Sequence, residues 1–176
     1  ALTYFQSLGN YSMMVKCHNL LGIAYAAREE HDMALQSYQE ALKIKKEHHV
    51  RQPKELLENN IADEYACLGD LKTAIKIFEK ILARQCRIKK PVLSFSAVVA
   101  YNLADAYSRL GDLEKAFQCI DKCGEFVAMM HEEYEEFIYH GLRARIHYEA
   151  GDIEKGNEYS DKITQYMKEN DNVAIE

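Results

Sequence analysis

The sequence predicts an all-α fold, a solenoid of stacked helical hairpins, and three observations support this. First, residues 60–74 (NIADEYACLGDLKTA) and 102–116 (NLADAYSRLGDLEKA) match at nine of fifteen positions, 42 residues apart. Second, Gly-Asp pairs begin at residues 69, 111 and 151, so the spacing is 42 and then 40 residues. Third, two prolines and eight glycines in 176 residues are too few for the turns of an all-β fold. A fixed period of this length is typical of repeat proteins, whose units bury their apolar faces against each other.

The repeat register extends in front of the first residue. Forty residues before Ala41 is Ala1, and ALTYFQSL at 1–8 parallels ALKIKKEH at 41–48. We therefore expect the sequence to be a segment of a longer protein. The predicted divisions are a remnant helix of a preceding repeat at 1–10, repeats at 11–50, 51–90, 91–130 and 131–170, and the start of a following helix or linker at 171–176.

Each repeat is predicted to contain two helices joined by a tight turn. In the second repeat, Ile61 and Tyr65 belong to one apolar stripe. Gly69 follows, where a helix C-terminus favours a left-handed residue, and Asp70 can cap the next helix. Ala74 is expected to be small because the two helices cross closely there. The third repeat has the same pattern in Leu103, Ala104, Tyr107, Leu110, Gly111, Asp112, Leu113, Ala116, Phe117 and Ile120.

Two repeats depart from this pattern. The first has Glu29 and Glu30 where Gly-Asp is expected, and a left-handed Glu29 would cost about 1 kcal/mol. The fourth has Arg143 and His147 at packing positions, with Gly156 in place of the small alanine. We expect the fourth repeat to be the most loosely packed, or to pack against a part of the protein outside this sequence.

The recurring residues resemble the tetratricopeptide repeat (TPR) family. The resemblance covers nearly the whole chain and implies a right-handed α-solenoid of TPR-like helical hairpins. The usual period of the family is about 34 residues, so this chain is similar to the lengthened repeats of bacterial peptide-sensing regulators and of signalling enzymes such as diguanylate cyclases. The residues that carry the resemblance are Leu21, Gly22, Tyr25, Ala34, Tyr38, Ala41, Ala62, Tyr65, Gly69, Ala74, Phe78, Leu103, Ala104, Tyr107, Gly111 and Ala116.

The resemblance also implies a binding groove lined by the first helix of each repeat. Two Asn-x-x-Asp pairs, Asn60 with Asp63 and Asn102 with Asp105, would point into it. An amide both donates and accepts, so it can hold the backbone of an extended peptide, while the aspartates favour a basic ligand. The alternative is that these residues bond to neighbouring helices and fix their stagger. The predicted partner-binding set is Asn19, Asn60, Asp63, Tyr101, Asn102, Asp105, Arg109, Leu142, Arg145 and Tyr148.

Other kinds of site find little support in the sequence. Of the residues that grip a C-terminal carboxylate in this family, only Asn60 has a counterpart, because Ile23 and Val98 replace polar or basic residues. Cys119 and Cys123 lie one helical turn apart but lack histidine partners, so we interpret them as core thiols. No glycine-rich phosphate loop or nucleophile–base set is present. We therefore predict no catalytic residues, no metal site and no cofactor.

Composition limits the class of partner. The net charge is −6 and the basic residues are scattered, which argues against nucleic-acid binding by this segment. No apolar run reaches the roughly 18 residues of a membrane span. Five cysteines in no disulfide pattern favour a cytoplasmic location. We predict a non-catalytic domain that binds a protein or peptide within a larger regulatory protein. A receptor for a short signalling peptide in a transcriptional regulator and a homodimerisation scaffold are the alternatives.

Overall fold

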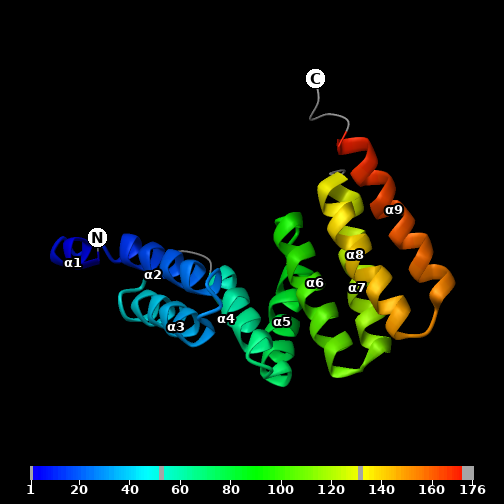
Figure 1. Cartoon of the computed structure of the whole chain (residues 1–176). Helices are drawn as coiled ribbons and strands as arrows, with labels where there is room; N and C mark the ends of the chain where they lie inside the picture. The colour runs from blue at the N-terminus through cyan, green and yellow to red at the C-terminus, as the bar shows by residue number, and fades with distance from the viewer. Residues whose placement is uncertain (1, 52–53, 131–132, 172–176) are drawn as a thin grey trace. The chain divides into compact units, whose positions relative to one another are not determined.

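All regular secondary structure in the described residues is α-helical, as the sequence predicted (Figure 1). The structure is a computed structural model that describes residues 2–51, 54–130 and 133–171. Most of the predicted terminal linker, residues 172–176, lies outside the described residues. The helices within these ranges are α1 (Leu2–Ser7), α2 (Tyr11–Ala26), α3 (His31–Glu47), α4 (Glu55–Cys67), α5 (Leu71–Gln85), α6 (Leu93–Leu110), α7 (Leu113–Met130), α8 (Glu133–Glu149) and α9 (Ile153–Asp171).

The chain divides into two compact units, residues 1–77 and 78–176, and the division falls inside α5. In the first unit, α2 packs against α3, and α3 packs against α4. In the second unit, α6 packs against α7, α7 against α8, and α8 against α9. The pairs α2–α3, α6–α7 and α8–α9 are helical hairpins of the predicted kind (Figure 1).

The repeated Gly-Asp pairs are the turns that reverse the chain within each hairpin. Gly111 has a φ of +86°, and its N–H and that of Asp112 donate to the carbonyls of Ser108 and Tyr107. These two bonds close the last turn of α6 as a Schellman motif. The Asp112 side chain then accepts a hydrogen bond from the N–H of Lys115 and caps α7. The same left-handed glycine and capping aspartate occur at Gly69, Asp70, Gly151 and Asp152.

The first repeat makes the same turn without glycine. Glu29 adopts a φ of +61°, and the N–H groups of Glu29 and Glu30 donate to the carbonyls of Ala26 and Tyr25. The bond pattern is therefore that of the turns at Gly111 and Gly151. The Glu30 side chain makes no capping hydrogen bond to α3, so this turn also lacks the side-chain cap found in the others.

Tyrosine rings determine where glycine is required inside two of the hairpins. A Cβ atom on Gly22 of α2 would lie 2.3 Å from the Tyr38 ring of α3. A Cβ atom on Gly156 of α9 would lie 2.4 Å from the Tyr148 ring of α8. In the fourth repeat the ring comes from the first helix and the glycine from the second, which explains why glycine replaces the alanine predicted there.

Polar residues at the packing positions of α8 are accommodated by aromatic rings. The Arg143 guanidinium, whose side chain is 17% exposed, lies 5.6 Å from the ring centroid of Tyr139 and 5.1 Å from that of Tyr159. It donates to Asp121 of α7 at 2.5 Å and to the Tyr139 hydroxyl at 2.7 Å. The imidazole of His147, a residue 6% exposed, stacks on the Tyr159 ring at 5.5 Å. These contacts join α7, α8 and α9.

His147 is held in the neutral form by its surroundings. Its Nδ1 lies 3.4 Å from a carboxylate oxygen of Asp152, which favours the charged imidazolium. Burial nevertheless lowers the pKa of His147 below its usual value of 6.5, and the cations of Arg143 and Lys155 act in the same direction.

Replacing Glu29 with glycine is expected to stabilise the chain by about 1 kcal/mol, because glycine adopts a positive φ without a Cβ clash. The measurement is the free energy of unfolding in urea, followed by circular dichroism. Glu29→Ala is the matched control, since it removes the same carboxylate but keeps the Cβ atom. Equal effects of the two variants would show that the charge, and not the backbone strain, matters at this turn.

Acidification from about pH 7.5 to about pH 5.5 is expected to lower stability. The folded-state pKa of His147 lies below the unfolded value of 6.5, so the unfolded chain binds more protons in this interval. His147→Gln removes this titrating group, and the urea midpoint should then fall less with decreasing pH. Identical slopes for His147→Gln and wild type would contradict the assignment.

Candidate functional site

In the first unit, the predicted asparagines pair with each other. Asn60 of α4 donates from Nδ2 to Oδ1 of Asn19 on α2 at 3.2 Å. Asp63, one turn further along α4, is exposed. Exposed apolar residues accompany the pair on both helices: Ile23 on α2 and Leu56 on α4. One amide donor of Asn60 is thus already used to link two first helices.

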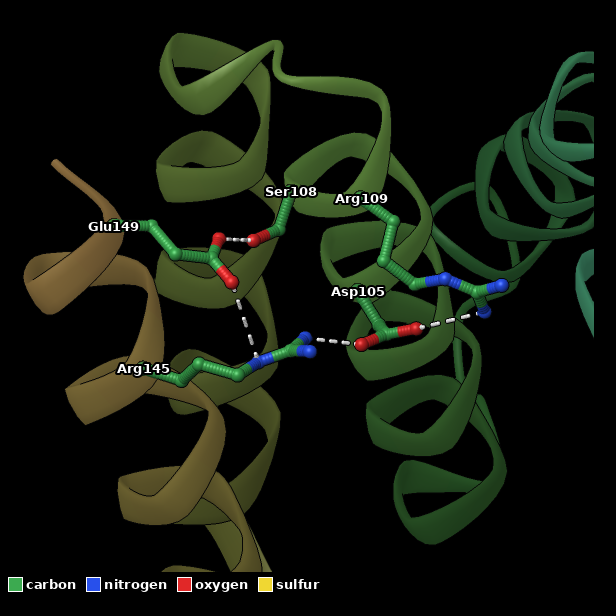
Figure 2. A network of polar contacts seen from close by, with 5 residues as sticks. All are labelled: Asp105, Ser108, Arg109, Arg145 and Glu149. Atoms are coloured by element: carbon green, nitrogen blue, oxygen red, sulfur yellow. Dashed lines mark hydrogen bonds and ion pairs between the residues drawn. The ribbon is translucent and has the colours of Figure 1, made fainter.

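In the second unit, five polar side chains connect α6 with α8 (Figure 2). Asp105 of α6 accepts a hydrogen bond from Arg145 of α8, and its other oxygen lies 3.5 Å from Arg109. Ser108 of α6 donates to Glu149 of α8, whose second oxygen lies 3.9 Å from Nε of Arg145. Both arginines and both carboxylates in this network are therefore paired.

These bonds join positions of successive repeats that are equivalent or displaced by one residue. The partners Asn19 and Asn60 are 41 residues apart, Asp105 and Arg145 are 40 apart, and Ser108 and Glu149 are 41 apart. Each separation is within one residue of the local repeat length. Asn60 and Asp105 therefore do what the alternative interpretation expected, because they bond to the neighbouring first helix.

An apolar pocket of about 340 Å³ lies beside the α6–α8 network. Its lining comes from three helices and consists of Ser94, Ala97, Val98, Tyr101, Asn102, Cys123, Val127, Ile138 and Tyr139. None of these side chains is charged at neutral pH. Burial raises the pKa of Tyr101, and it raises the pKa of Cys123 to about 12, so both groups stay neutral.

Asn102 differs from its counterpart Asn60. It contributes to the lining of the apolar pocket, and its amide makes no hydrogen bond to any residue in the described ranges. The two Asn-x-x-Asp motifs, identical in spacing, therefore have different roles. In the second motif, Asp105 is paired with arginines, whereas the Asn102 amide has no hydrogen-bond partner among the described residues.

One predicted site residue is buried, and the tyrosine predicted beside it also bonds within its own hairpin. Leu142 is 3% exposed, because it shares the buried stripe of α8 with Ile146. It offers no surface to a ligand. Tyr148 lies against α9, where its hydroxyl donates to Oδ1 of Asn157 at 2.9 Å and lies 3.0 Å from the hydroxyl of Ser160. Its ring packs against Gly156 of α9, within the α8–α9 hairpin.

The sequence interpretation missed two features. Glu64 is 3% exposed, and its carboxylate lies 2.8 Å from Nδ1 of His31, a contact between α4 and the start of α3. The signal in the sequence was the position of Glu64, three residues after Ile61 within an apolar stripe. A carboxylate at a buried position needs a polar partner. The floor of the apolar pocket was also missed, because Cys123 and Val127 belong to α7 and only first helices were considered.

The described residues offer little to a metal ion. All five cysteines are free thiols. Burial raises the pKa of Cys119 to about 11 and that of Cys123 to about 12, and metal binding requires the thiolate. Across the described ranges, no three His, Cys, Asp or Glu side chains gather into a candidate metal site. None of the helices in these ranges combines enough length with enough apolar character to traverse a bilayer.

Two family models match hairpins of the chain. Both are described as tetratricopeptide repeat, and they match residues 15–48, which contain most of α2 and α3, and residues 97–124, in α6 and α7. The chain therefore contains tetratricopeptide repeats at these two hairpins. Both TPR matches fall on hairpins that the sequence pattern predicted. A comparison with curated proteins gives no match.

Several solved structures have a similar fold. BtubC (BKLC) from P. vanneervenii superposes with a TM-score of 0.79 over 92% of this chain, at 18% identity. A Podosopora anserina putative kinesin light chain with nearly identical TPR-like repeats superposes with a TM-score of 0.70 over 88% of this chain. The sequence identity is 16%, and the match covers 75% of that structure. MamA from Desulfovibrio magneticus RS-1 superposes with a TM-score of 0.66 over 96% of this chain. The sequence identity is 18%, and the match covers 84% of that structure. The chain spans only 66% of the BtubC structure.

These comparisons confirm the predicted fold class, an α-solenoid of TPR-like helical hairpins. They also indicate that the chain is a protein-interaction repeat domain, since repeat proteins of this type use their extended surfaces to bind other proteins. The resemblance to the longer-period repeats of bacterial regulators stays a prediction, as do the repeat boundaries.

The Asp105–Arg145 contact is expected to contribute about 0.5–1 kcal/mol of coupling energy, because it belongs to a network between two helices. The measurement is a double-mutant cycle with Asp105→Ala and Arg145→Ala in urea. In about 1 M salt the coupling should shrink, since the screening length falls to about 3 Å. The matched cycle on Glu158 and Lys162, a pair 3.0 Å apart within α9, should give less. Zero coupling for Asp105 and Arg145 at low salt would contradict a structural role.

Proposed function

We propose that this chain is a non-catalytic TPR segment that binds a protein or peptide, within a larger cytoplasmic regulatory protein such as a TPR-linked signalling enzyme. The observation that carries the proposal is the apolar pocket on the α6–α8 side of the second unit. The Asn102 amide lies in its wall and makes no hydrogen bond within the described residues. An apolar cavity with a few polar groups is the usual form of a binding site.

The polar residues around the pocket support binding rather than chemistry. Asp105, Arg109 and Arg145 are held in ion pairs, which fixes their positions. Tyr101 combines apolar contact area with a hydroxyl, a property that makes tyrosine frequent in interfaces. Catalysis would need a nucleophile beside a base, and the lining of the pocket contains no histidine or carboxylate that could act as the base.

Selection from a phage-displayed library of random peptides on the immobilised chain tests this proposal. We expect enriched peptides to share a pattern and to bind Asn102→Ala about fivefold more weakly, because one hydrogen bond contributes about 1 kcal/mol. The melting temperature should be unchanged. Gln118→Ala, which removes an exposed amide from α7, is the matched control and should bind like wild type.

Two outcomes would overturn the proposal. The first is a selection without enrichment. The second is a set of peptides that bind wild type, Asn102→Ala and Gln118→Ala equally. Light scattering on the same samples tests the alternative of a homodimerisation scaffold. If the chain is such a scaffold, the measured mass should be twice that of the monomer.

A further inference from the structure

We propose that a basic cavity in the first unit, between the end of α3 and the start of α4, binds the phosphate monoester group of an organic ligand. This chemistry is shared by a phosphorylated small molecule and by a phosphorylated side chain of a partner protein, and the probes below distinguish the two sources. The cavity is separate from the apolar pocket of the second unit, so the inference is independent of the proposed function.

The cavity has a volume of about 580 Å³ and carries an excess of positive charge. Four basic residues line it: Lys45 and Lys46 in the last turn of α3, His49 in the turn that follows, and Lys54 at the start of α4. Among the described residues of the lining, Glu58 is the only carboxylate. With His49 neutral, three lysines and one glutamate give the lining a charge of +2, although the chain has a net charge of −6. The local field therefore favours an anion.

Two of the lysines have partners within the chain. Nζ of Lys45 donates to the carbonyl of Val50 at 2.6 Å, just after the end of α3. Nζ of Lys54 lies 2.6 Å from a carboxylate oxygen of Glu58, one turn along α4. A lysine near a helix C-terminus is favourable for the helix dipole, and Lys45 fulfils that role. These contacts explain Lys45 and Lys54 without any ligand.

The other two basic residues have no such explanation. The side chains of Lys46 and His49 make no hydrogen bond or ion pair with any residue in the described ranges. His49 also has a φ of +50°, a left-handed conformation that strains a residue with a Cβ atom and that glycine adopts freely. The turn by itself would favour glycine, and the histidine found there instead lines the cavity. Lys46 and His49 are therefore the residues that a ligand would engage.

The charge and the donors of the lining favour a phosphate monoester over a carboxylate. A phosphate monoester carries about two negative charges at neutral pH and three strong acceptor oxygens, whereas a carboxylate carries one charge on two oxygens. A lysine ammonium has three donors, and Lys45 uses one of them on Val50. Lys45, Lys46 and His49 can thus each offer a donor to one oxygen, and the charge of the lining matches that of the dianion.

The remainder of the cavity suits the organic part of such a ligand. A bare phosphate ion has five heavy atoms and would leave most of the volume of about 580 Å³ to water. Leu42 and Val50, both partly buried, give the lining apolar surface next to the cations. A hydrocarbon group attached to the phosphate would cover this surface and gain affinity from its burial. We therefore expect an organic phosphate to bind more tightly than inorganic phosphate.

Titration of the isotope-labelled chain at about pH 7.5 and low salt, followed by the amide shifts of Lys46, His49 and Val50, tests the inference. The probes are phenyl phosphate, phenyl sulfate and inorganic phosphate. Phenyl sulfate has nearly the shape of phenyl phosphate but only one negative charge. We expect saturable shifts with phenyl phosphate and binding of the other two probes that is about fivefold weaker.

A phosphopeptide distinguishes the two sources of the group. The peptide N-acetyl-Gly-Ser-pTyr-Ser-Gly-amide carries the same phenyl phosphate group on an extended backbone. Tighter binding of this peptide than of phenyl phosphate would support a phosphorylated segment of a partner protein. Binding of phenyl phosphate alone would support a phosphorylated small molecule. The unphosphorylated peptide should leave the three amides unshifted in either case.

Variants of the lining separate ligand binding from structural effects. Lys46→Gln should weaken phenyl phosphate binding about fivefold. Lys43→Gln is the matched control, because Lys43 lies on the same helix, pairs with Glu40 at 3.5 Å and does not line the cavity. Glu58→Gln removes a negative charge from the lining and should strengthen binding, which misfolding could not do. His49→Gly should weaken binding yet raise the urea midpoint, because glycine relieves the strained backbone.

Four results would overturn the inference. They are shifts that do not saturate by about 10 mM phenyl phosphate, equal binding of phenyl phosphate and phenyl sulfate, equal effects of Lys46→Gln and Lys43→Gln, and tighter binding of a single-stranded oligonucleotide than of phenyl phosphate. An oligonucleotide without terminal phosphates contains only phosphodiesters, so the last result would make the cavity a nucleic-acid contact. Each of these results would leave the apolar pocket and the proposed function untouched.

Discussion

The left-handed residue at the end of each first helix is the constraint on which the hairpins depend. At Gly69, Gly111 and Gly151 the backbone takes a positive φ, and at Glu29 it does so despite a Cβ atom. This conformation lets the next N–H groups satisfy the last carbonyls of the helix and turns the chain back on itself. The close crossings and the shared apolar cores of each hairpin follow from that reversal, because the second helix returns along the first.

The fold was predictable because it is determined by local, repeated signals. Gly-Asp marks the turn, the apolar spacing marks the buried stripe, and both recur with Ala74 and Ala116 at the crossing. Even the exceptional turn at Glu29 followed from its place in the register. Periodicity could not reveal that Gly156 leaves space for the Tyr148 ring. That conclusion requires the position of the ring against the backbone of α9.

The candidate site was predictable only in part. Counting positions along a helix places Tyr101, Asn102 and Asp105 together, and the structure has them next to the pocket or in the adjoining network. The same counting put Leu142 on the surface, although its stripe is covered by neighbouring helices. Whether an asparagine is used internally depends on the residue found one repeat away, so Asn60 and Asn102 look alike in the sequence and differ in the fold.

The arrangement of Asp105, Arg109, Arg145 and Glu149 has a kinetic consequence. Two positive and two negative groups lie together and neutralise one another, so this network itself projects little electrostatic field into the solvent. These four groups would not steer a partner toward the pocket from a distance, and without other steering the encounter would proceed at the ordinary rate of about 10⁵–10⁶ M⁻¹s⁻¹ for uncharged surfaces. Lifetime of the complex, rather than speed of capture, would then distinguish one partner from another.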